Sequence, residues 1–99
     1  PGITKTYKDL NAFKLGLLSL KSGNLTGEER FGVFEALVEP GSPFRSLAKE
    51  QQALILIEQG KIELAIKTLM EITDDSETTD TLRRRVTQLR ISLGSDPNN

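Results

Sequence analysis

Cysteine, histidine and tryptophan are absent from the 99 residues of the chain. The lack of cysteine excludes a disulfide framework and thiolate metal sites. Without histidine or cysteine, a nucleophile with its base could be built only from lysine or from paired carboxylates. We therefore expect no catalytic residue, no metal ligand and no cofactor site, and we predict that the protein is not an enzyme.

Long apolar runs and a large excess of charge are also missing. No segment reaches the roughly 18 apolar residues of a membrane-spanning helix, and no signal peptide is visible, so we expect no membrane insertion by this chain. The formal net charge is -1, whereas nucleic-acid binding usually needs a clustered basic excess. The chain begins Pro1-Gly2 without an initiator methionine, and we expect it to be a fragment of a longer protein.

Apolar residues recur at spacings of three and four, which is the signature of amphipathic helices, and no segment alternates with period two. Proline and glycine separate five such segments. We predict helices from Thr4 or Thr6 to Ser22, from Thr26 to Val38, over Ser42–Gln59, over Lys61–Thr73, and from before Leu82 to Gly94. The pattern predicts an all-α protein.

Several local signals support these boundaries. Thr26 and Glu29 form a capping-box pattern, and Ser42 followed by Pro43 is a typical helix start. The helix over Ser42–Gln59 is apolar around much of its circumference, so we expect it to be the most buried. The polar tail over 95–99 is expected to be disordered.

Glycine recurs at the ends of three predicted helices, at Gly23, Gly60 and Gly94. The last two are 34 residues apart, which is the tetratricopeptide period, and the first two are 37 apart. Alignment on these glycines pairs Gly16 with Ala53, small residues that let two helices approach closely, and Ala65 is the second such position of the repeat. We predict a short right-handed helical-hairpin solenoid of about five helices, or two and a half tetratricopeptide-like repeats. A plain bundle of five glycine-terminated helices is the alternative.

Three stretches carry a more specific resemblance: GSPFRSLAKEQQAL from Gly41, Glu58-Gln59-Gly60, and LRRRVTQL from Leu82. They resemble the C-terminal part of the tetratricopeptide-like proteins of alphaproteobacteria related to the ancillary SecYEG translocon subunit. The resemblance implies an upstream membrane anchor, a location on the periplasmic side of the inner membrane, and partners among translocon subunits or periplasmic chaperones. A cytoplasmic location is the alternative.

Paired carboxylates and an arginine run are the remaining charged features. Glu28/Glu29 and Asp74/Asp75 are better explained by helix capping and solvation than by acid–base chemistry. Successive residues of a helix point in different directions, so Arg83, Arg84 and Arg85 are expected to form a solvated face rather than one anion-binding patch.

These patterns favour a protein-interaction or scaffold domain that binds its partner on the inner face formed by the first helix of each repeat. The residues predicted on this face are Lys14, Glu50, Gln51, Arg84 and Gln88. The alternative is a self-association module, a homodimer held by large apolar residues left uncovered in a short solenoid. Its candidates are Phe13, Leu17, Leu20, Leu54 and Ile57.

Overall fold

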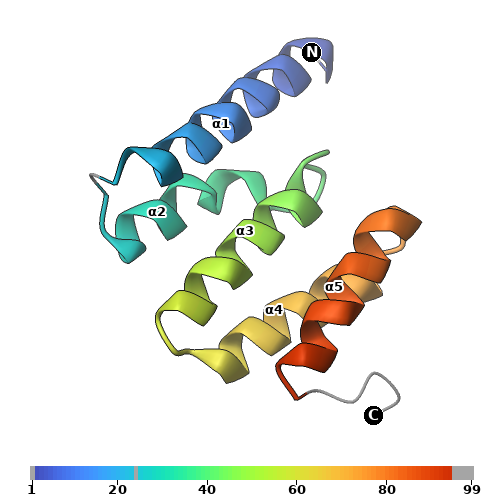
Figure 1. The fold of residues 1–99 in the computed structure, drawn as a ribbon. Coiled ribbons are helices and arrows are strands. Elements are labelled where there is room, and N and C mark those ends of the chain that lie inside the picture. Colours follow the sequence, from blue (N-terminus) through green and yellow to red (C-terminus); the bar gives the residue numbers. More distant parts are fainter. Residues whose placement is uncertain (1, 24, 95–99) are drawn as a thin grey trace.

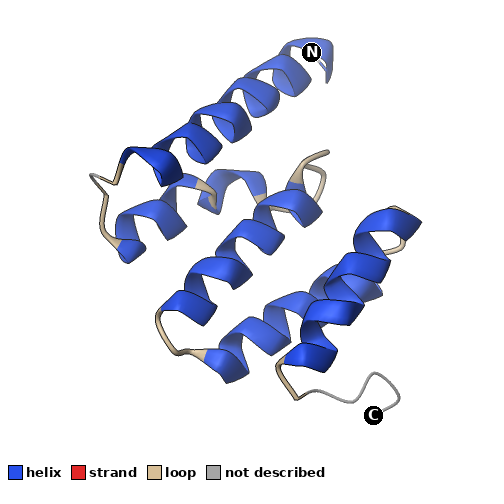
Figure 2. Cartoon of the chain, viewed as in Figure 1, coloured by secondary structure: helices blue, strands red, loops and turns tan. Residues whose placement is uncertain are grey.

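The computed structural model describes residues 2–23 and 25–94, which form helices joined by short loops (Figures 1 and 2). In chain order these are α1 (Gly2–Ser22), α2 (Gly27–Val33), a 3-10 turn over Glu35–Leu37, α3 (Arg45–Glu58), α4 (Ile62–Asp74) and α5 (Asp80–Ser92). No β-strand occurs within the described ranges, so the all-α prediction is confirmed. The tail over 95–99, predicted to be disordered, lies outside the described residues.

The helices pack in the order in which they follow one another, and α3 makes its most extensive contact with α4. Figure 1 shows α1, α3 and α5 running in the same general direction, with α2 and α4 returning between them. The molecule is flat, measuring 40 × 33 × 18 Å along its principal axes. An arrangement this thin leaves each helix with a side that no other helix covers, and this side is narrowest on α3.

Glycines in the left-handed conformation end three of the helices, as predicted. Gly23, Gly60 and Gly94 have φ angles of 72°, 75° and 93°. Residues other than glycine rarely adopt this backbone conformation, because their Cβ atom is crowded there. The capping box at α2 is also confirmed, because the Thr26 hydroxyl accepts from the Glu29 N–H and the Glu29 carboxylate accepts from the Thr26 N–H.

Two predicted helix starts are wrong. Thr4 and Thr6 both lie inside α1, which begins at Gly2, so neither is its N-cap. α3 begins at Arg45 rather than at Ser42-Pro43. The Ser42 side chain is buried instead, where its hydroxyl accepts from the Phe44 N–H and donates to the Asp9 carboxylate of α1.

The second predicted helix is not continuous to Val38. α2 ends at Val33, and a 3-10 turn follows over Glu35–Leu37. In the tighter 3-10 geometry, side chains three residues apart point the same way. Phe34 and Leu37 can therefore both enter the core, where they are 0% and 2% exposed.

Two apolar clusters fill the core, and α3 contributes to both. The first contains Phe34, Leu37, Ala48 and Ile55, with Phe13 and Leu17 of α1 packed against it. The second contains Ala53, Leu69, Ile72, Leu82 and Val86. Six of the 14 residues of α3 are buried, which confirms the prediction that it is the most buried helix.

Small residues occupy the predicted close-approach positions. Gly16 is buried, and a Cβ atom added there would lie 2.7 Å from a ring carbon of Phe34, closer than real Cβ contacts allow. Ala53 and Ala65 are completely buried, whereas Ala36 in the 3-10 turn is exposed.

Replacing Ala53 or Ala65 by leucine should destabilise the protein, because neither site has room for a larger side chain. Overpacking a tight core costs about 1–3 kcal/mol, which is a large part of the roughly 5–10 kcal/mol expected for a domain of this size. We expect each substitution to lower the melting temperature by at least ~4 °C in a thermal melt followed by circular dichroism.

Ala36→Leu is the matched control and should shift the melting temperature less, since its site faces solvent. Unchanged melting of both Ala53→Leu and Ala65→Leu would contradict close helix packing at these two positions.

Candidate interaction surface

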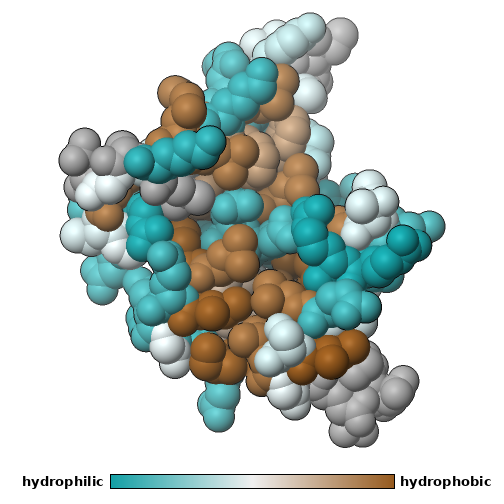
Figure 3. Space-filling model, viewed as in Figure 1, coloured by the Kyte–Doolittle hydropathy of each residue, from teal (hydrophilic) through white to brown (hydrophobic). Residues whose placement is uncertain are grey.

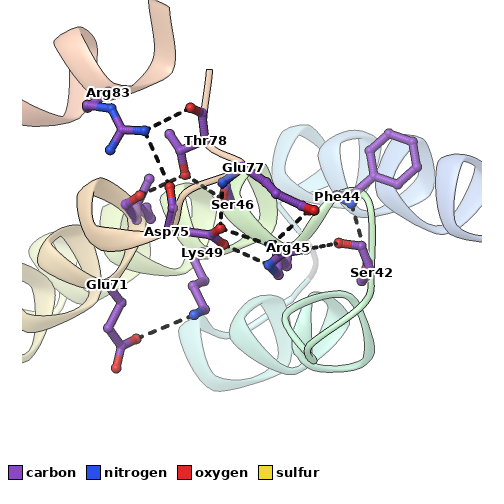
Figure 4. Close-up of polar contacts among 11 residues, drawn as sticks. Ser42, Phe44, Arg45, Ser46, Lys49, Glu71, Asp75, Glu77, Thr78 and Arg83 are labelled. Carbon is purple, nitrogen blue, oxygen red and sulfur yellow. Dashed lines mark hydrogen bonds and ion pairs between the residues drawn. The ribbon is translucent and has the colours of Figure 1, made fainter. Parts of the chain in front are cut away.

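Arg45, the first residue of α3, joins that helix to the loop between α4 and α5 (Figure 4). Its Nε and one terminal nitrogen donate to the two carboxylate oxygens of Asp75, at 2.7 and 2.9 Å, and the same terminal nitrogen donates to Glu77 at 3.0 Å. The Ser46 and Thr78 hydroxyls lie 2.9 Å apart beside this pair, and Thr78 also donates to the Ile72 carbonyl. This polar contact fixes where α5 begins relative to α3.

The paired carboxylates are used in capping and ion pairing. The Arg45 guanidinium, followed by the Glu77 backbone N–H, holds the pKa of Asp75 below its ordinary value. The Thr26 backbone N–H, followed by the Thr26 hydroxyl, does the same for the pKa of Glu29 at the start of α2. Both carboxylates are stabilised in their charged form, which is the opposite of what a general acid at neutral pH requires.

The arginine run of α5 divides into three different roles. Arg83 donates to the backbone carbonyls of Thr73 and Asp75 at the C-terminal end of α4, where unpaired carbonyls favour a positive charge. It also donates to the Thr78 carbonyl in the loop before α5. Arg84 is exposed. Arg85 is exposed as predicted and also pairs with Glu50, so the prediction of a solvated face is wrong only for Arg83, which is half-buried.

Glu50 does not lie on an accessible face. It is 7% exposed, and both of its carboxylate oxygens accept from Arg85, at 2.6 and 2.8 Å. The fork-shaped contact ties α3 to α5 and raises the pKa of Arg85, chiefly through these hydrogen bonds. The prediction that Glu50 binds a partner is therefore wrong. Its carboxylate instead holds α5 against α3.

The other four predicted residues remain accessible. Lys14 of α1 and both Arg84 and Gln88 of α5 are exposed, and Gln51 of α3 is half-buried. They come from the three helices that run in the same direction in Figure 1. Figure 3, in the same view, shows apolar side chains gathered over the middle of this face, above α3, with polar side chains along its margins.

Leu54 is an exposed apolar residue on the same side of α3 as the predicted residue Gln51. It follows Gln51 by one turn of α3 and is 41% exposed, although α3 is otherwise largely buried. The sequence pattern favours Leu54 as a residue of the alternative, a self-association surface. Of the other residues assigned there, Phe13, Leu17 and Ile57 are half-buried, and the Leu20 side chain lies outside the described residues.

The described residues hold no group of three or more acidic side chains placed to bind a metal ion. Among the described helices, none combines the length and the apolar character needed to cross a membrane. Comparison of the chain with protein-family models, with curated proteins and with solved structures finds no match.

The Arg45–Asp75 pair should make stability depend on pH. Because the pKa of Asp75 is lowered in the folded protein, the pair stabilises the fold at neutral pH, and this contribution is lost as the pH falls through the lowered pKa. Asp75→Asn should cost about 1–2 kcal/mol at pH 7. The difference from the unchanged protein should shrink below about pH 4.

Urea unfolding at several pH values measures this effect. Asp74→Asn is the control, since Asp74 is adjacent and exposed and forms no ion pair with the described residues. An equal loss of stability in both variants at pH 7, or a loss in Asp75→Asn that persists unchanged in acid, would be inconsistent with a stabilising Arg45–Asp75 pair.

Proposed function

We propose that the chain is a protein-interaction domain that binds its partner on the face shared by α1, α3 and α5. The observation that carries this proposal is Leu54, a large apolar side chain left 41% exposed at the centre of a helix whose other sides are packed. Gln51, Arg84, Gln88 and Lys14, on the same three helices, add hydrogen-bonding and charged groups that solvent reaches. An apolar centre with a polar rim is the usual composition of a protein interface.

A tetratricopeptide-like repeat is the architecture that best explains this face. The common direction of α1, α3 and α5, the left-handed glycines 37 and 34 residues apart, and the buried small residues Gly16, Ala53 and Ala65 support it. In such solenoids the first helices of successive repeats line an extended surface for a partner. The chain would then contain about two and a half repeats, and α5 would cover the end.

The partner and its location follow from the resemblance of the Gly41–Leu54 and Leu82–Leu89 stretches. We propose translocon subunits or periplasmic chaperones as partners, with the domain held at the periplasmic side of the inner membrane by an upstream anchor. Self-association remains the second candidate function, because a homodimer is another way to cover Leu54.

A photo-reactive amino acid placed at position 54 tests the proposal directly. After irradiation in an alphaproteobacterial periplasmic extract, we expect a specific crosslink to another protein from position 54. The matched control is position 64, because Leu64 on α4 is 52% exposed but lies outside the proposed face.

Crosslinks of the same proteins from positions 54 and 64, or none from either, would reject the proposed face. A crosslink between two copies of the chain, together with a dimer by light scattering at ~100 µM, would instead establish self-association.

A further inference from the structure

The side of α1 that faces away from the rest of the molecule carries three large apolar residues. Tyr7, Leu15 and Leu18 are 66%, 65% and 61% exposed. At about 100° per residue, positions 7, 15 and 18 fall within roughly 80° of one another around the helix, so they lie on one side of it, opposite the buried Asp9 and Gly16. A helix at the end of a packed stack normally presents a polar side to water.

The opposite end of the molecule does show such a polar side. On α5 the exposed residues are Asp80, Thr81, Arg84, Arg85, Gln88, Ile91 and Ser92. Only Ile91 among them is a large apolar residue. Of the two end helices, α1 therefore carries more of the uncovered apolar surface.

The outward side of α1 is also uniformly basic. The helix has four lysines and a single acidic residue, Asp9, which is buried against Ser42 and paired with Lys5. Lys8, Lys14 and Lys21 are exposed. None of the three forms an ion pair with a carboxylate of the described residues. No acidic group is left on this side to offset them.

A shallow groove of about 330 Å³ runs along this helix, lined by Lys14, Leu17, Leu18 and Lys21. The two leucines form an apolar floor, and the two lysines stand two turns apart at its ends. An apolar side chain of a ligand would contact the two leucines, and carboxylates on either side of it would pair with Lys14 and Lys21.

We propose that the outward side of α1 binds an acidic amphipathic helix of a partner protein, with leucine-like residues in the groove and aspartates or glutamates against Lys8, Lys14 and Lys21. This surface borders the face around Leu54, and Lys14 belongs to both, whereas Tyr7, Leu15, Leu18 and Lys21 belong to the outward side of α1 alone. A second copy of the chain fits poorly, because pairing two α1 helices would bring lysines together without acidic partners. Lys14 and Lys21 stand two turns apart on one side of α1, a spacing that carboxylates on a partner helix match better than a lipid surface does.

Direct binding of a synthetic peptide tests this proposal. The probe is a helical peptide of about four turns with leucines at i, i+3 and i+7, glutamates on both flanks and one tryptophan. The chain itself contains no tryptophan, so the peptide fluorescence reports binding without background from the protein. We expect saturable binding that weakens as salt is added, and no binding of the same peptide with lysine in place of glutamate.

Substitutions on α1 should weaken that binding without unfolding the protein, since the altered side chains are exposed. Leu18→Ser should raise Kd about tenfold, as expected for a leucine buried on binding. Lys14→Glu combined with Lys21→Glu should raise it about threefold to tenfold. Leu64→Ser and Lys67→Glu on α4 are the matched controls and should leave Kd unchanged.

The proposal is wrong if the acidic peptide does not bind at concentrations up to about 1 mM, or if the lysine peptide binds equally well. It is also wrong if the substitutions on α1 and on α4 change Kd to the same extent. Binding to phosphatidylglycerol vesicles but not to the peptide would identify a lipid surface instead, and loss of a dimer in Leu18→Ser would identify a second copy. The crosslinking test at position 54 is independent, because Leu18→Ser leaves that face intact.

Discussion

The burial of α3 from two sides is the constraint on which the rest of the structure depends. Ala48 and Ile55 pack into the cluster around Phe34, while Ala53 packs into the cluster around Ile72. A flat molecule with two small clusters gains stability only if one element belongs to both. α3 has that position, and polar contacts hold its two ends. Arg45 pairs with Asp75 of the loop after α4 at the start, and Glu58 pairs with Arg30 of α2 at the end.

The position of α3 also determines what the surface can offer to a partner. Because helices pack against it on both sides, only a narrow strip that includes Gln51 and Leu54 stays accessible. Glu50, one residue before Gln51, falls under Arg85 of α5 and serves packing instead. A shift of one residue along a helix turns the side chain by about 100°, which separates an interface residue from a structural one.

The helices and their glycine ends could be predicted from the sequence because both are set by neighbouring residues. The periodic apolar positions and the left-handed glycines act over one or two turns, and the small residues Gly16 and Ala53 followed from spacing. The break of the second helix at Phe34 could not be predicted, because it depends on a ring that packs against Gly16 of another helix. The start of α3 at Arg45 likewise reflects Ser42 bonding to Asp9, 33 residues away.

The candidate site was predictable only in part, for the same reason. Helical periodicity placed Lys14, Gln51, Arg84 and Gln88 on the helices that share a face. Glu50 was misassigned because its ion pair joins residues 35 positions apart, and no local pattern distinguishes Arg85 from Arg84. The exposure of Tyr7, Leu15 and Leu18 on the outward side of α1 was not predicted, because it follows from the absence of any described helix beyond α1.

Native-state hydrogen exchange gives the most direct test of the central position of α3. We predict that amides in the middle of α3, from Ala48 to Leu56, exchange only through global unfolding and have the highest protection in the protein. Amides near Tyr7 in α1 should exchange through smaller local openings, because that part of the helix is exposed. Faster exchange in α3 than in α4 or α5, through an opening that leaves those two helices protected, would contradict this prediction.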